Sequence, residues 1–196
     1  MSAPLTEKAR QTRGRMIRCA QEIILEDGIE ALSMDRVAER AGMSKGAVMY
    51  HFKTKRALLA ALIEAYAEHL DERLKHAESF FEGTPDETLV PGYILWFREF
   101  DKNNMGWADI GLSLLVQKVR DPELLQPVRD WYARLHERVA QMPPERRIRT
   151  LLVLMTMEGF FFTRKFGLDL MTQDEKNEVC EELLTLSCSA AKPRAG

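Results

Sequence analysis

The chain has 196 residues, of which 45% are hydrophobic, enough to build a substantial buried core. Its formal net charge of −2 excludes a generally basic nucleic-acid-binding protein, but the charge is unevenly distributed. Residues 1–56 carry 11 Lys and Arg against 7 Asp and Glu, whereas residues 57–196 carry 17 against 23. A polyanionic partner is therefore expected at the N-terminal end.

The cysteines and the apolar runs exclude further classes of protein. Cys19, Cys180 and Cys188 form neither a CxxC pair nor a metal-binding pattern with histidine, so disulfide and zinc frameworks are not expected. The N-terminus lacks the apolar core of a signal peptide, and the longest apolar runs, such as 151–155, are too short to span a bilayer. We expect a soluble protein of the reducing cytoplasm, with no membrane partner.

Apolar residues recur at helical spacing along the chain and the breaks fall at Gly or Pro, which predicts an all-α fold of about nine helices with no strand. A first helix is expected over 6–27, ending at Gly28, and a long helix over 54–81, ending before Gly83. Between them lies a pair of short helices, described below. The later helices are expected over 86–101, 105–119, 121–142, 145–166 and 174–188, followed by a frayed tail.

The stretch Ser33–Phe52 has the pattern of a helix-turn-helix. Two short helices can cross steeply when a small residue lies at their contact, a residue free to take positive φ forms the turn, and a branched apolar residue packs beneath the second helix. Ala38, Gly42 and Val48 fit these roles in that order. A serine precedes each helix and can act as its N-cap.

This organisation resembles the TetR family of transcriptional regulators, most specifically over Ala41–Leu59 and strongly over about residues 10–60. The resemblance implies a three-helix DNA-binding domain over residues 1–53. It also implies a helical effector-binding and dimerisation domain over residues 54–196. By the same resemblance, Ser44–Phe52 is the recognition helix that enters the major groove.

Several residues of the helix-turn-helix are expected to contact DNA. Lys45 can reach a guanine edge or a phosphate, Ala47 can touch a thymine methyl group, and Gly46 lets the backbone approach. The family commonly has an aromatic hydroxyl where Met49 stands, so here that position offers only apolar contact. Phosphates would be held by Tyr50, His51 and Lys55, and Ser33, Arg36 and Ser44 complete the expected set.

The C-terminal part is expected to bind a second copy of the chain and a small-molecule effector. The helix over 145–166 has more apolar surface than one core needs, and pairing it and the helix over 174–188 with their dimer mates would form a four-helix bundle. The residues expected at this interface are Leu151, Met155, Phe162, Val179 and Leu183. Those that could line an effector pocket, or simply pack the core, are Phe80, Phe81, Trp96, Phe97, Phe100, Met105, Trp107, Trp131 and Phe160.

Glu158 stands among apolar residues of its predicted helix, where an unpaired carboxylate would be costly. Two interpretations remain open. The carboxylate could recognise a cationic or hydrogen-bonding ligand, or it could pair with an arginine at or across the dimer interface.

We predict a homodimeric transcription factor, a repressor that binds a palindromic operator and releases it when a small molecule binds. The alternatives are a regulator controlled by a protein partner, an activator, and a small-molecule sequestering module. An enzyme is not expected, because the sequence has no nucleophile motif, phosphate-binding glycine loop or separated acid pair. His69, Glu72 and His76 have a spacing that suits a metal, but polar helix faces collect such residues, and we expect neither a metal nor another cofactor.

Overall fold

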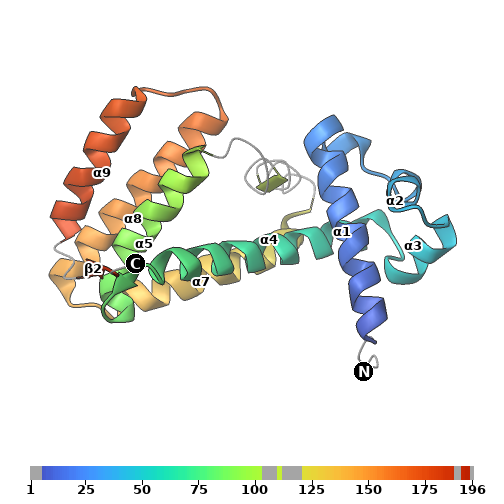
Figure 1. Cartoon of the computed structure of the whole chain (residues 1–196), viewed down its shortest axis with the longest axis horizontal. Helices are drawn as coiled ribbons and strands as arrows, with labels where there is room; N and C mark the ends of the chain where they lie inside the picture. The colour runs from blue at the N-terminus through green and yellow to red at the C-terminus, as the bar shows by residue number, and fades with distance from the viewer. Residues whose placement is uncertain (1–5, 103–109, 112–120, 188–190, 195–196) are drawn as a thin grey trace. The chain divides into compact units, whose positions relative to one another are not determined.

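A computed structural model describes residues 6–102, 110–111, 121–187 and 191–194 (Figure 1). Its fold is all-helical except for one pair of very short strands, which confirms the predicted class. The chain divides into two compact units. The first combines Met1–Ala67 with Met105–Val128, and the second combines Glu68–Asn104 with Arg129–Gly196.

The first unit contains the N-terminal helices and the start of the long helix. Its elements are α1 (Glu7–Asp27), the 3₁₀ turn η1 (Ile29–Ala31), α2 (Met34–Ala41), α3 (Lys45–His51), the first part of α4 (Lys55–Glu78) and the 3₁₀ turn η2 (Pro122–Leu125). α1 packs against α2, and α2 packs against α3. Met16, Ala20 and Ile23 on one face of α1 are fully buried, as the helical spacing predicts.

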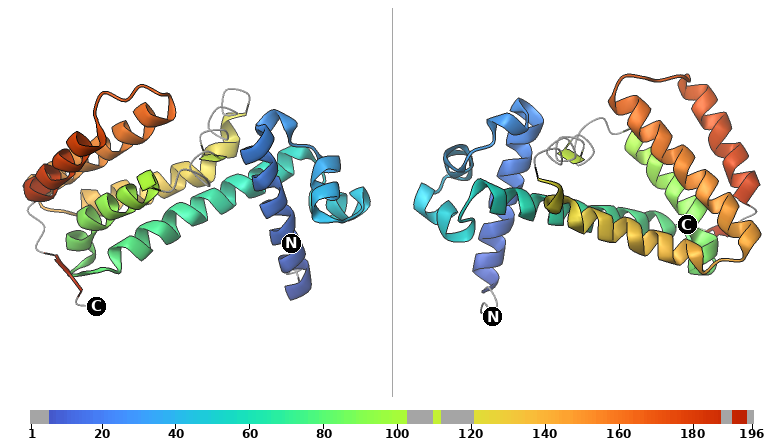
Figure 2. Two further views of the ribbon diagram at one scale, coloured as in Figure 1. Left: turned by 45° about the horizontal axis from the view of Figure 1, so that its top comes forward. Right: turned by 180° about the vertical axis from the view of Figure 1, so that it is seen from behind.

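The second unit is built mainly from long helices. Its elements are the rest of α4, α5 (Pro85–Lys102), most of α7 (Gln126–Ala140), α8 (Pro144–Lys165) and α9 (Gln173–Ser187). Figure 2 shows α8 beside both α5 and α9, in agreement with their packing contacts. Val153, Met157 and Phe160 form the buried side of α8.

The start of α5 depends on local hydrogen bonds that the sequence makes available. The Glu87 carboxylate accepts from the backbone N–H and the hydroxyl of Thr84, at 2.8 and 2.9 Å, which is the carboxylate half of a capping box. Pro91 lies inside α5 without ending it. A Cβ atom at Gly92 would lie 2.6 Å from Cγ of Glu78, so a glycine is required where α5 meets α4.

The end of the long helix differs from the prediction. α4 ends at Glu78 rather than at Phe81, because Phe81 belongs to the strand β1 (Phe81–Glu82), which pairs antiparallel with β2 (Lys192–Pro193). The expectations of no strand and of a frayed tail were therefore wrong at these positions. Strands of two residues are too short to show the alternation by which a strand is recognised in a sequence.

The helix predicted over 105–119 falls mostly outside the described residues. Ile110 and Gly111 are described, and both are helical and buried. A Cβ atom at Gly111 would lie 2.5 Å from the Tyr66 ring, so this glycine allows a close approach to α4 within the first unit.

Candidate nucleic-acid interface and effector region

The turn between α2 and α3 has the predicted geometry. Gly42 adopts the left-handed conformation, with φ 61° and ψ 40°, and its N–H group bonds to the Glu39 carbonyl at 3.0 Å. The N–H group of Met43 bonds to the Ala38 carbonyl at 2.9 Å, so the carbonyls at the end of α2 are satisfied. Val48 is completely buried beneath α3. These contacts fix the angle between the two short helices.

Three hydroxyl groups cap the helices of this region. The side-chain oxygens of Ser33 and Ser44 each accept from the backbone N–H three residues later, at 3.2 Å. Thr54 does the same at the start of α4, at 3.1 Å. The first turn of each helix keeps further N–H groups without an intrahelical partner, and together with the helix dipole they favour an anion such as a phosphate.

One side of α3 is exposed while the other side packs the core. Phe52 and Val48 are buried, whereas Ser44, Lys45 and Gly46 are exposed. Ala47 and Met49 are half-buried at the edge of the same surface. A Cβ atom at Gly46 would meet nothing closer than 3.9 Å, so the helix is open to an approaching surface there. The exposed side therefore offers small and cationic groups that the core does not use.

Aromatic and basic groups gather between α3 and α4. The Tyr50 side chain is 72% exposed, its ring meets the His51 ring edge-on at 5.3 Å, and Lys53 Nζ lies 5.6 Å from its centroid. Lys55 is exposed at the first residue of α4. Sequence reasoning missed Lys53, although its position directly after the recognition helix could have indicated it. This group suits the phosphate contacts expected of it.

Two of the predicted DNA-contacting cations already have acidic partners. Lys45 Nζ lies 3.0 Å from the Asp35 carboxylate, and Arg36 pairs with Asp27 at 2.5 Å. The side chains of Lys45 and Asp35 are 60% and 67% exposed and those of Arg36 and Asp27 are 39% and 42% exposed, so the solvent screens both pairs and a phosphate can replace the carboxylate. Ser33 and Arg36 are half-buried at the start of α2. The acidic partners were not predicted from the sequence.

Arg56, which follows Lys55, forms ion pairs with acidic residues of the first unit. Its guanidinium donates to Asp121 at 2.6 Å and to Glu123 at 3.3 Å, at the turn η2. The hydrogen bond from Arg56 lowers the pKa of Asp121. These contacts tie the first turn of α4 to a segment 65 residues later in the chain.

Of the residues predicted to line an effector pocket, Trp96 and Trp131 meet edge-on at 6.2 Å, whereas Phe81 lies apart from them in the chain, on β1. Trp131 and Phe97 are buried, Trp96 is half-buried, and Phe81 lies on β1, away from the helical positions expected for it. Met105, Trp107 and the side chain of Phe100 lie outside the described residues.

Within the described residues of one chain, Glu158 has two tyrosine partners, and its pairing with an arginine of a second copy stays a prediction. The Tyr93 hydroxyl donates to its carboxylate at 2.6 Å, and the Tyr132 hydroxyl also hydrogen-bonds to it. Burial raises the pKa of Glu158, and the two hydroxyl groups act in the opposite direction. Neither tyrosine was predicted from the sequence, because they lie on α5 and α7.

The metal interpretation of the long helix gains no support. Burial and the neighbouring Arg73 lower the pKa of His69 to about 4. Within the described ranges, no three His, Cys, Asp or Glu residues are placed to hold a metal ion.

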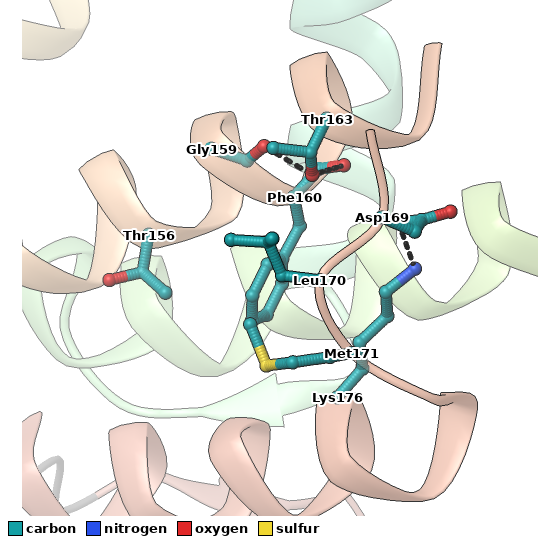
Figure 3. A pocket seen from close by; sticks show the side chains of 8 residues that line it. All are labelled: Thr156, Gly159, Phe160, Thr163, Asp169, Leu170, Met171 and Lys176. Carbon is teal, nitrogen blue, oxygen red and sulfur yellow. Dashed lines mark hydrogen bonds and ion pairs between the residues drawn. The ribbon is translucent and has the colours of Figure 1, made fainter. Parts of the chain in front are cut away.

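A pocket of about 220 Å³ opens beside the second half of α8 (Figure 3). The chain between α8 and α9 closes one side of it, where Lys176 Nζ pairs with Asp169 at 2.6 Å. Phe160, one of the residues that the sequence offered for an effector pocket, lines this one together with Thr156, Gly159, Thr163, Asp169, Leu170, Met171 and Lys176.

α8 also carries an exposed apolar stripe, which we call the α8 stripe. Its side chains are 40–66% exposed and recur at helical spacing: Ile148, Leu152, Met155 and Phe162 on α8, and Phe166 directly after the helix. Of the predicted interface residues, Met155 and Phe162 lie on the stripe, and Leu151 and Val179 are half-buried. Leu183 is only 8% exposed and packs inside the unit, because α9 turns this side chain toward the core. Leu186 is instead the exposed leucine of α9.

The fold and the exposed recognition helix define a helix-turn-helix DNA-binding regulator. The family model for bacterial regulatory proteins, tetR family, matches residues 17–62, and the model for the tetracyclin repressor-like C-terminal domain matches residues 89–187. The chain therefore belongs to the TetR family of transcriptional regulators. This family consists of regulators rather than enzymes.

Curated relatives match the chain over part of their length. The transcriptional regulator CymR of Pseudomonas putida is 30% identical over 122 residues, which cover 62% of this chain and 58% of CymR. The class C tetracycline repressor of Escherichia coli is 49% identical over 53 residues, 27% of this chain and 24% of the repressor. The chain thus spans less than two thirds of the length of these relatives.

Solved structures share the fold over nearly the whole chain. The multidrug-binding protein EbrR complexed with ethidium superposes with a TM-score of 0.66 at 20% identity, covering 88% of this chain and 98% of EbrR. A transcriptional regulator of Streptomyces coelicolor A3(2) gives a TM-score of 0.67 at 19% identity, covering 89% and 99%.

Proposed function

We propose that the protein is a repressor that binds a palindromic operator as a homodimer and releases it when a small molecule binds the second unit. The exposed side of α3 carries this proposal. Lys45, Tyr50 and Lys55 are exposed although the core beneath them is complete, so they are available for DNA. One recognition helix reads only a few base pairs, so a two-fold pair is needed for a specific site.

The α8 stripe supports the homodimer. A row of large apolar side chains open to water is destabilising unless a partner covers it, and the same row on a second copy is self-complementary around a two-fold axis. By helical spacing, Gly159 lies between Met155 and Phe162 on this side of α8, so the pocket of Figure 3 opens next to the stripe. A side chain of the second copy can fill it.

The effector part of the proposal rests on the family and on α4. EbrR is described as a multidrug-binding protein and is seen with ethidium and with imidazole. α4 contributes to both units of this chain, so a ligand that shifts its later turns can move the recognition helices of the dimer out of register with the DNA.

Activation of transcription is the alternative to the proposed repression. FasR of Mycolicibacterium smegmatis, 31% identical over 67 residues, is a transcriptional activator, and the helix-turn-helix of an activator would have the same features.

We also propose that the protein acts in the cytoplasm. No helix within the described ranges is long and apolar enough to cross a membrane.

Selection of bound duplexes from a random library tests the proposal. We expect enrichment of an inverted repeat whose half-site centres lie about 34 Å apart, one turn of DNA. Enrichment of a single half-site or a direct repeat would contradict the homodimer. A library that shows no enrichment would contradict operator binding altogether.

A further inference from the structure

Four aromatic side chains and the Glu158 carboxylate make a closed circuit of contacts inside the second unit. Tyr93 bonds to Glu158 at 2.6 Å, and its ring meets the Trp96 ring edge-on at 5.4 Å. Trp96 meets Trp131 at 6.2 Å, and Trp131 meets Tyr132 at 4.9 Å. The Tyr132 hydroxyl then returns to Glu158. Helices α5, α7 and α8 each contribute to this circuit, which we call the aromatic ring.

The carboxylate in the aromatic ring has no positive counter-charge from the part of the chain that the structure describes. Its partners there are two hydroxyl groups, and it takes part in none of the described ion pairs. Glu158 is half-buried, so its carboxylate loses part of its hydration, and neutral donors restore only part of what water supplied. A cation brought to this position would replace the missing counter-charge.

The aromatic groups select the same kind of ligand. The faces of indole and phenol rings attract cations, most strongly where water is excluded, whereas they do not favour anions. Tyr93 and Trp131 are 4% and 3% exposed, so this part of the ring lies within the protein interior. A carboxylate and several electron-rich rings in one place favour a cation that also carries apolar surface.

Tyr132 provides access to the aromatic ring. Its side chain is 41% exposed, in contrast to its buried neighbours. Turning toward solvent would break its contact with the Trp131 ring and its hydrogen bond to Glu158, and would free one oxygen of Glu158 for a ligand. The other hydroxyl, on the buried Tyr93, would continue to orient the carboxylate.

We infer that the effector of this protein is an organic cation with an aromatic or apolar body, held by the Glu158 carboxylate within the aromatic ring. This inference rests on the proposed function, because it names the class of molecule that the regulator senses. It goes beyond that proposal because it names the charge of the effector and the residues that bind it, the Glu158 carboxylate and the aromatic side chains around it.

Two ions of matched size test the inference by isothermal titration calorimetry on the full chain. Tetraphenylphosphonium and tetraphenylborate have the same shape and opposite charge, and benzyltrimethylammonium is a smaller cation. We expect the wild-type protein to bind at least one of the two cations at least tenfold more tightly than tetraphenylborate. Glu158→Gln keeps the size of the side chain and an oxygen that accepts from Tyr93, and we expect it to weaken cation binding at least tenfold.

Glu145→Gln is the matched control, because Glu145 is an exposed carboxylate on the same helix. It should leave cation binding unchanged. Tyr132→Phe, which removes the hydroxyl that competes for the carboxylate, should strengthen it. Failure of both cations to bind, equal binding of anion and cation, or undiminished binding by Glu158→Gln would overturn the inference. DNA affinity measured on the same samples separates these outcomes from failure of the proposed function, since Glu158 is absent from the DNA-binding surface.

Discussion

The helix-turn-helix and the aromatic ring show two ways in which a chain builds a site. In the helix-turn-helix, the decisive bonds join close neighbours, such as Gly42 to Glu39 and Ser44 to Ala47. In the aromatic ring, Glu158 finds its partner Tyr93 65 residues away. The first kind of site can be recognised from spacing and turn chemistry. The second kind depends on how helices pack, so a sequence shows only that one residue is unusual.

Breaking the dimer should produce the largest effect, and it should leave each unit folded. Met155→Asp places a charge in the centre of the α8 stripe, where a second copy would have to bury it. Loss of the paired recognition helices should lower operator affinity about 100-fold or more. Sedimentation velocity should show monomers. Ala133→Asp, an exposed change on α7, is the control and should remain dimeric.

Gly42→Val tests the locally built turn. A branched residue in the left-handed conformation costs about 2 kcal/mol, so the helix-turn-helix should unfold more readily than the second unit. Hydrogen exchange should show faster opening of α1, α2 and α3 with little change in α8. Gly46→Ala is the matched glycine, with ordinary helical φ and open space for a Cβ atom, and should not lower stability. Equal losses in both variants would contradict the role of Gly42.

Replacing Lys45 and replacing Lys55 should change DNA binding in different ways. Lys55→Ala removes a phosphate contact, so affinity should fall similarly for all sequences and the salt slope should decrease by about 1. Lys45→Ala removes a group that can read a base edge, so it should also relax the base preference. Titrations against operator and random duplexes at several salt concentrations measure both. Equal loss on both duplexes for both variants would remove this division of roles.

The smallest expected effect comes from the acidic partner of the recognition helix. Asp35→Asn removes the carboxylate 3.0 Å from Lys45, which should raise affinity for DNA a few-fold because this anion no longer competes with the phosphates. The increase should be largest at low salt. Unchanged affinity at low salt would show that the pair does not restrain Lys45.

Much of the fold follows from helical periodicity and caps, and the rest depends on distant contacts. The helix predicted over 145–166 lies at Pro144–Lys165, since prolines mark its start and Gly167, with φ 65°, follows its end. Phe81 was misplaced because its strand exists only through pairing with the far C-terminal segment. Leu183 was expected at the dimer interface but packs inside the second unit. Helical periodicity identifies the apolar side of α9, but it does not identify the helix that packs against that side. The positions of Lys45 and Tyr50 were predictable, but the ion pair with Asp35 was not.

Fluorescence-anisotropy titration against DNA from the protein's own promoter region, beside a scrambled duplex of equal length, tests the central claim most directly. At two salt concentrations, we predict tight binding to the promoter duplex that persists near physiological salt, and weak binding to the scrambled duplex that salt removes. Equally weak binding to both duplexes would contradict the assignment of this chain as an operator-binding regulator of that promoter.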